Sequence, residues 1–258
     1  MKRPLGMRFS PWFPDLLYFV DAYQGIFILD TVKNITLSVF GNTSMPYLND
    51  FDFLWNGDLI LSEPSTDHLD DMFHRIVLEG RPNGRLLRYS PNERKFSVIL
   101  DGLYTPNGVQ ASPDRKCIYF SEMLAYRIQR VDFHESSDHT TTVILDGLPG
   151  MPDNIRFTKD QKKLIIPLPE ERLDLPLDWR VIKHYVLFVY EKFLIQEPPY
   201  FGEFAEVLFF DIVTKNITNA WRGPTGENAG GITQVLEIEK NKYLLGSDTA
   251  PALFSLEI

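Results

Sequence analysis

The chain has 258 residues, which is enough for one domain with a substantial core. Its composition of 44% hydrophobic and 24% charged residues is typical of globular proteins and excludes disordered, collagen-like and coiled-coil classes. The excess of 35 acidic over 26 basic residues gives a net charge of -9, so nucleic acid is not expected as a partner. The single cysteine, Cys117, excludes an intrachain disulfide, and its apolar surroundings at 117–120 predict a buried, inert thiol.

Short apolar runs separated by turn residues predict strands along most of the chain. In chain order they cover 16–20, 26–29, 58–62, 85–89, 96–100, 109–112, 117–121, 127–133, 141–145 and 207–212. Two segments interrupt this pattern. Residues 65–80 carry Asp67, His68, Asp70, Asp71 and His74, but their spacing fits no metal finger, so a solvated loop or short helix is favoured over a metal cluster.

The second interruption is a long insertion at 168–205, with apolar side chains at roughly helical intervals. It predicts a helical insertion near 170–200. A helix packed over one face of the domain is favoured over a surface that touches lipid headgroups, because the segment carries few cations.

A repeat of about 45 residues organises the chain. The hexapeptide VILDGL at 98–103 returns at 143–148, and in the residues that follow Asn107 corresponds to Asp153. The same unit begins near 48 and near 232. Four strands in about 45 residues is the period of a propeller blade, so we expect one all-β propeller domain over 1–258. An ordinary β-sandwich is the alternative.

The repeat also predicts a site. The innermost strand of each blade runs along the central channel, so equivalent positions point to one axis at one height. Those positions are Leu5, Asn49, Asn107, Asp153 and Thr233, with Asn154 beside Asp153. Amide and carboxylate oxygens from separate blades form the hard-oxygen shell that calcium prefers. The alternative is that these Asn and Asp residues only begin turns.

Several longer strings carry a resemblance to a known family. They are RPLG at 3–6, FVDAYQGIF at 19–27, ND at 49–50, GRLLRY at 84–89, PNGVQASP at 106–113 and LPGMPDNIR at 148–156. Through them the whole chain resembles the strictosidine synthase-like family, whose six-bladed propellers are related to calcium-dependent paraoxonases and lactonases. The resemblance implies a six-bladed type that is incomplete at the amino end, with about four and a half blades present.

The resemblance also implies roles for individual residues. Asn49, Asn107, Asp153 and Asn154 resemble the paraoxonase-type calcium ligands, whereas the first-blade glutamate of those proteins has no counterpart here. Thr233 stands at the position of the catalytic glutamate of strictosidine synthase, so alkaloid condensation is not implied, because threonine cannot act as a carboxylate base. With one negative charge among Asn49, Asn107 and Asp153, we expect calcium to bind weakly.

Two functions from different classes follow from this resemblance. The first is a divalent-metal-dependent hydrolase that acts on small hydrophobic esters or lactones, with Asp153 as a catalytic group. The second is a non-catalytic propeller with a structural calcium, attached to an endomembrane in its full-length form.

The compartment is indicated by three sequons for N-glycosylation, at Asn34, Asn42 and Asn216. No apolar run reaches the ~18 residues that cross a bilayer, and the start of the chain has no apolar signal region. We therefore expect the full-length form in the lumen of the endoplasmic reticulum or another endomembrane, or at the cell surface, held by an amino-terminal anchor that this chain lacks.

Overall fold

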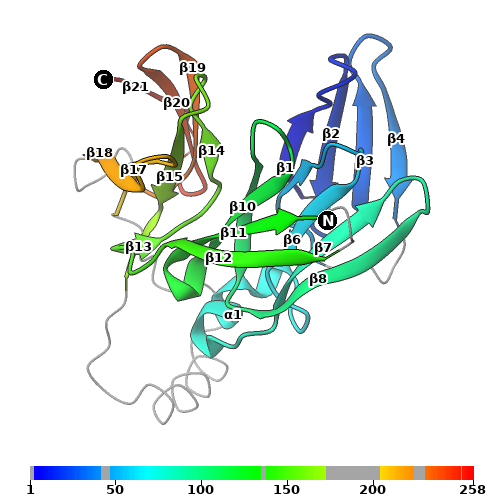
Figure 1. Ribbon diagram of the computed structural model, residues 1–258, viewed down its shortest axis with the longest axis horizontal. Helices are drawn as coiled ribbons and strands as arrows, with labels where there is room; N and C mark the ends of the chain where they lie inside the picture. The colour runs from blue at the N-terminus through cyan, green and yellow to red at the C-terminus, as the bar shows by residue number, and fades with distance from the viewer. Residues whose placement is uncertain (1–2, 42–46, 135–137, 173–203, 224–229, 251) are drawn as a thin grey trace.

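The computed structural model describes residues 3–41, 47–134, 138–172, 204–223, 230–250 and 252–258. Its strands form five antiparallel sheets that follow one another along the chain, from the first sheet at the right of Figure 1 to the last at the left. In each sheet consecutive strands are neighbours, and the five sheets are the blades of a β-propeller. The all-β propeller predicted from the repeat is confirmed.

The blades have three or four strands each. The first contains β1 (Pro4–Phe9), β2 (Leu16–Asp21), β3 (Gly25–Asp30) and β4 (Ile35–Phe40). The second contains β5 (Phe51–Phe53), β6 (Leu59–Glu63), β7 (Gly84–Ser90) and β8 (Lys95–Leu103). The third contains β9 (Pro106–Ala111), β10 (Cys117–Glu122), β11 (Arg127–Phe133) and β12 (His139–Leu145). The fourth contains β14 (Arg156–Phe157), β15 (Lys163–Leu168), β17 (Glu206–Asp211) and β18 (Asn216–Arg222), and the fifth contains β19 (Ile232–Glu239), β20 (Lys242–Ser247) and β21 (Phe254–Glu257).

The predicted count of about four and a half blades is corrected to five, because the last unit forms a sheet of three strands. A separate two-stranded sheet joins β13 (Gly150–Met151) to β16 (Glu170–Glu171). Within the first interruption, η1 (Asp70–Met72) and α1 (Phe73–Glu79) confirm the short helix. The helix expected near 170–200 lies mostly outside the described residues. No described helix is long and apolar enough to cross a membrane.

The hydrophobic core is divided among the interfaces between neighbouring blades. Val20 and Ile26 of the first blade pack with Phe51 of the second, and similar clusters fill the next three interfaces. Along β10, Cys117 faces the fourth blade and Ile118 faces the second, because successive side chains of a strand point to opposite faces. A fully buried aliphatic or aromatic side chain contributes about 1.5–3 kcal/mol, so these interfaces hold the blades in order.

Side-chain carboxylates connect the innermost strands of the second and third blades. Asp50 accepts a hydrogen bond from the Val109 backbone N–H at 2.9 Å, and Asp52 accepts one from the Ala111 N–H at 2.8 Å. These carboxylates therefore satisfy backbone donors on the side of β9 that faces β5. From the first hydrogen bond to the second, the acceptor moves from Asp50 to Asp52 and the donor from Val109 to Ala111, so both move two residues forward along the chain. The strands β5 and β9 therefore run parallel.

Cys117 provides a check on this packing. It is 3% exposed, and burial raises the pKa of its thiol. We expect the thiol to resist a disulfide reagent such as Ellman's reagent in the native chain and to react fully in denaturant, because the thiolate is the reactive form. A native reaction as fast as that of an unfolded control would contradict the packing of β10 between two blades.

Candidate functional site in the propeller channel

Asn107 and Asp153 come from different blades, as the repeat predicts. Asn107 lies in β9 of the third blade, whereas Asp153 precedes β14 of the fourth. Gly108 allows the two backbones to approach closely, since a Cβ added there would lie 2.4 Å from the Asp153 carbonyl oxygen and 2.5 Å from the Ile155 nitrogen. The absence of a side chain at Gly108 therefore brings the two predicted ligand segments into contact.

The side-chain oxygen of Asn107 is left without a donor. Asn107 is 4% exposed, and its Nδ2 contacts the Met123 sulfur at 3.1 Å, but its Oδ1 is buried with no hydrogen-bond partner. Leaving a buried polar atom unsatisfied costs about 1–3 kcal/mol. A bound ligand or cation at this oxygen would remove that cost.

The Asp153 carboxyl group is buried close to other acids. Burial raises its pKa well above the usual value, and the charges of Asp248 and Asp50 act in the same direction. Arg156 opposes these effects without cancelling them. A positive charge supplied beside Asp153 would favour its ionised form.

The other two predicted ligands have different contacts. Asn154 donates from Nδ2 to Asp153 Oδ1 at 3.0 Å and to the Thr233 carbonyl oxygen at 3.3 Å, so its amide nitrogen faces Asp153. The Asn49 side chain interacts with the Tyr47 hydroxyl. Within the part of the chain that the structure describes, no three His, Cys, Asp or Glu side chains gather as a metal site. Of the four predicted ligands in the described chain, Asn107 is the one whose buried side-chain oxygen lacks a hydrogen-bond partner.

Sequence reasoning missed two further acids near this end of the channel, Glu170 and Asp248. Glu170 Oε2 is buried without a hydrogen-bond partner, and burial together with the charge of Asp248 raises the pKa of Glu170 to about 7. Burial also raises the pKa of Asp248. Glu170 can therefore gain or lose a proton near neutral pH.

A repeat signal for these acids was present in the sequence. An acidic residue ends the second strand of each blade or follows it within two residues. The residues concerned are Asp21, Glu63, Glu122, Glu170 and Asp248. Glu63 is paired with Arg85 at 2.5 Å and Glu122 with Arg127 at 2.6 Å, whereas Glu170 keeps an oxygen without a donor.

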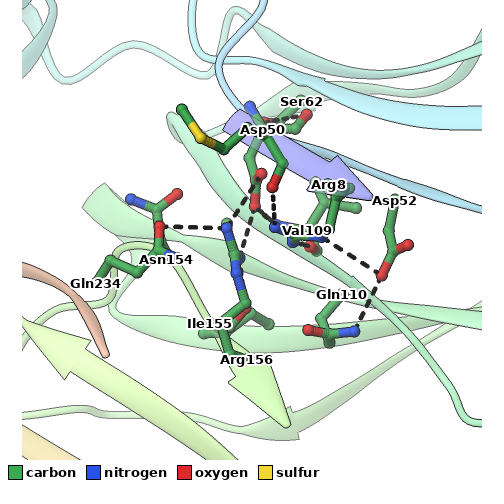
Figure 2. A network of polar contacts seen from close by, with 12 residues as sticks. Arg8, Asp50, Asp52, Ser62, Val109, Gln110, Asn154, Ile155, Arg156 and Gln234 are labelled. Atoms are coloured by element: carbon green, nitrogen blue, oxygen red, sulfur yellow. Dashed lines mark hydrogen bonds and ion pairs between the residues drawn. The ribbon is translucent and has the colours of Figure 1, made fainter. Parts of the chain in front are cut away.

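Asp50 is the centre of a polar network that crosses the channel (Figure 2). Its carboxylate is fully buried and accepts hydrogen bonds from Arg156 Nη1 at 2.9 Å and from Arg8 Nη2 at 3.3 Å, in addition to the one from Val109. Arg156 also lies 3.4 Å from Gln234 Oε1. We call these five residues the channel network; its members come from all five blades.

The two arginines decide the charge of Asp50. Burial alone would raise the pKa of Asp50, but Arg156 and Arg8 hold it below its usual value. Burial, reinforced by Arg8, lowers the pKa of Arg156 to about 10, so this guanidinium remains charged at neutral pH. Asp50 and Arg156 therefore form a charged pair within the channel network, whereas burial and the neighbouring acids raise the pKa of Asp153.

Sequence comparisons find similarity to one family over part of the chain. The strictosidine synthase family model matches residues 49–136. Protein STRICTOSIDINE SYNTHASE-LIKE 13 of Arabidopsis thaliana is 32% identical over 163 residues, which are 61% of this chain and 40% of that protein. The adipocyte plasma membrane-associated protein of Rattus norvegicus is 33% identical over 161 residues, covering 60% and 42%. The matched part thus spans about two fifths of these relatives.

Solved structures agree with the fold. A luciferin-regenerating enzyme has a TM-score of 0.59 at 12% identity and covers 100% of this chain and 78% of its own. A calcium-binding regucalcin from Agrobacterium tumefaciens has a TM-score of 0.59 at 14% identity, covering 98% and 74%. At this identity the structures show the propeller fold alone. The sequence relatives and the family model, on a propeller scaffold, support assignment of this chain to the strictosidine synthase-like family.

Proposed function

We propose that the chain is a divalent-cation-dependent hydrolase of small hydrophobic esters or lactones, with calcium as the cation. The observation that carries the proposal is the buried Oδ1 atom of Asn107, which has no hydrogen-bond partner. It lies next to Gly108, which approaches the backbone of Asp153, a residue whose carboxyl group is also buried. The fold likeness to a calcium-binding regucalcin and to a putative gluconolactonase supports it.

Asn107 and Asp153 would hold the cation, with Asn49 and Asn154 completing the oxygen shell after their side chains turn. When bound, the cation would polarise the substrate carbonyl group. Asn154 positions the Asp153 carboxyl group by donating a hydrogen bond to its Oδ1 atom at 3.0 Å. Asp153 is the proposed proton acceptor. The channel network on the adjacent inner strands fixes the backbone that carries both ligands.

The proposal is tested by calorimetric titration of calcium into the chain, and by hydrolysis of phenyl acetate and a γ-lactone with calcium or with a chelator. We expect Asp153→Ala to weaken calcium binding at least tenfold, a loss of about 1.4 kcal/mol, and to abolish calcium-dependent hydrolysis. Asp146→Ala, which removes an exposed aspartate, is the matched control and should change neither. Equal affinity in all three proteins would contradict the proposed site.

The second candidate is a non-catalytic propeller with a structural calcium. It is favoured by Thr233, which offers no carboxylate at the fifth inner strand. In that case calcium would raise the melting temperature, because a ligand that binds only the native state stabilises it, while neither ester nor lactone would be hydrolysed above the rate in buffer.

For the architecture, we propose the six-bladed ring of the family as a single domain, of which the present residues form five blades. For the compartment, we propose an endomembrane lumen, such as the endoplasmic reticulum, or the cell surface, with membrane attachment through an amino-terminal anchor in the full-length form. The name of the adipocyte plasma membrane-associated relatives supports membrane attachment.

The compartment makes a prediction about glycans. The sequon residues Asn34 and Asn216 are both exposed, whereas Asn42 lies outside the described residues. Chain produced through the secretory pathway is expected to carry N-glycans at the exposed sequons, and peptide N-glycosidase should increase its gel mobility. Asn34→Gln combined with Asn216→Gln should remove most of that shift. Unchanged mobility after enzyme treatment would contradict a lumenal location.

A further inference from the structure

The insertion at 65–80, which the proposed function does not use, brings one buried carboxyl group to the segment that precedes β5. Asp70 in η1 is 6% exposed, whereas the neighbouring Asp71 is exposed. The next element, α1, packs Ile76 into the same apolar cluster as Tyr47 and lies at the lower end of the molecule in Figure 1. The insertion is therefore fixed against the residues that lead into the second blade.

Asp70 is connected to the predicted ligand Asn49 through one hydroxyl group. Tyr47 Oη donates to Asp70 Oδ1 at 2.9 Å, and Arg3 Nη1 lies 2.6 Å from the other carboxylate oxygen, Oδ2. The Asn49 side chain forms a hydrogen bond with the same Tyr47 hydroxyl group. Tyr47 is 2% exposed and Asn49 is 9% exposed, so these contacts are made inside the protein. We call Arg3, Asp70, Tyr47 and Asn49 the hydroxyl relay.

The chemistry of the hydroxyl relay determines which atom of the Asn49 amide faces Tyr47. A carboxylate has acceptors only and a guanidinium group has donors only, so Asp70 accepts from both Arg3 and Tyr47. Tyr47 has a single hydroxyl proton, which it gives to Asp70. Toward Asn49 the Tyr47 oxygen can then act only as an acceptor, so Asn49 presents its Nδ2 atom. The Oδ1 atom, which is the cation-binding atom of an amide, is left outside this hydrogen bond.

The backbone of Asn49 is fixed on both sides. Its N–H donates to the Ser62 carbonyl oxygen at 3.0 Å, and its carbonyl oxygen accepts from the Gly6 N–H at 2.8 Å. The side chain is thus the part of Asn49 that needs positioning. With the nitrogen held at Tyr47 as a pivot, a turn of the side chain toward a cation moves the oxygen forward.

We propose that Asp70 is a positioning residue that acts through Tyr47 to turn the Asn49 amide, so that its oxygen stays available as a ligand. Groups that orient a metal ligand without touching the metal commonly change metal affinity 10- to 100-fold when they are replaced. The effect on calcium rests on the proposed function, whereas the orientation of the amide exists with or without calcium.

Asp70→Asn tests the proposal by reversing the hydroxyl relay. Because Arg3 offers donors only, the new amide directs its oxygen at Arg3 and its nitrogen at Tyr47. The Tyr47 hydroxyl group then donates to Asn49 and occupies its oxygen. In calorimetric titration we expect calcium affinity to fall about tenfold or more. Asp71→Asn removes the same charge at the exposed neighbouring position, and this matched control should leave the affinity unchanged.

Tyr47→Phe separates orientation from a general loss of structure. Without the hydroxyl group the Asn49 amide is no longer held, so affinity should fall, but less than in Asp70→Asn. In the double variant Tyr47→Phe, Asp70→Asn the affinity should recover to the level of Tyr47→Phe, because no hydroxyl group remains to occupy the Asn49 oxygen. If Asp70 only supported the fold, the second change would add a further loss, and that outcome would overturn the proposal.

Neutron diffraction from calcium-free crystals tests the orientation directly. We expect the Tyr47 hydroxyl deuterium to point at Asp70 Oδ1 and the deuterated nitrogen of Asn49 to face Tyr47. An Asn49 oxygen that faces Tyr47, or an unchanged calcium affinity in Asp70→Asn, would overturn the proposal. A wild-type chain with the expected deuterium positions that binds no calcium would support the hydroxyl relay and contradict only the proposed function.

Discussion

Asp50→Ala is expected to destabilise the chain by about 3–5 kcal/mol, because removing one partner of a buried ion pair leaves the other charge uncompensated. Here one carboxylate is shared by the guanidinium groups of Arg156 and Arg8 and by the Val109 N–H. Denaturant unfolding followed by circular dichroism measures the change. A loss below about 1 kcal/mol, the level of an ordinary surface ion pair, would show that the channel network does not hold the blades together.

A double-mutant cycle separates the ion pair from simple loss of packing. Arg156→Met removes the charge but keeps an unbranched side chain of similar reach. We expect the double variant Asp50→Ala, Arg156→Met to be less destabilised than the sum of the two single changes. Each single change leaves the charge of the remaining partner buried without its counter-charge, whereas the double variant removes both charges. Additive losses would mean that the two residues act independently.

Gly108→Ala is expected to weaken both the fold and the candidate site. Its Cβ would lie 2.4 Å from the Asp153 carbonyl oxygen and 2.8 Å from the Asn154 Cα, and these backbone atoms can move only if the third and fourth blades separate. Overpacking of this kind costs about 1–3 kcal/mol or more, which corresponds to a fall in melting temperature of about 2–4 °C per kcal/mol for a chain of this size. Calcium affinity should fall with it.

Gly246→Ala is the control for this substitution. Gly246 lies in β20, and a Cβ added there would meet nothing within 4 Å. Its melting temperature should equal that of the wild type or exceed it, because alanine restricts the unfolded chain more than glycine does. If the two glycine variants have the same melting temperature, the close approach of the two blades at Gly108 does not constrain the fold.

The fold was predictable because a repeat sums many weak local signals. The first VILDGL string ends the outer strand β8, the second begins within the outer strand β12 and continues three residues past its end at Leu145, and the predicted strand at 127–133 matches β11 in both bounds. The strand at 109–112 was placed too late, since β9 already begins at Pro106. Asn107 therefore lies within the strand rather than in the turn before it, where residue preferences alone would place an asparagine.

The candidate site was only partly predictable. The register correctly placed Asn107 and Asp153 in neighbouring blades, but it does not determine side-chain direction, and Asn154 directs its amide nitrogen at Asp153. The pairing of Arg156 with Asp50 joins residues 106 positions apart, so no local pattern could indicate it. The acids Glu170 and Asp248 were missed because the search followed the first strand of each blade and not the second.

The proposed cation site in the channel depends on Asn107 and Asp153. The most direct measurement is an anomalous difference map from crystals of the chain grown with calcium. We expect a peak about 2.3–2.6 Å from both the Asn107 Oδ1 atom and a carboxylate oxygen of Asp153, the distances typical of calcium–oxygen contacts. A calcium peak elsewhere, with Asn107 Oδ1 still lacking any partner, would contradict it.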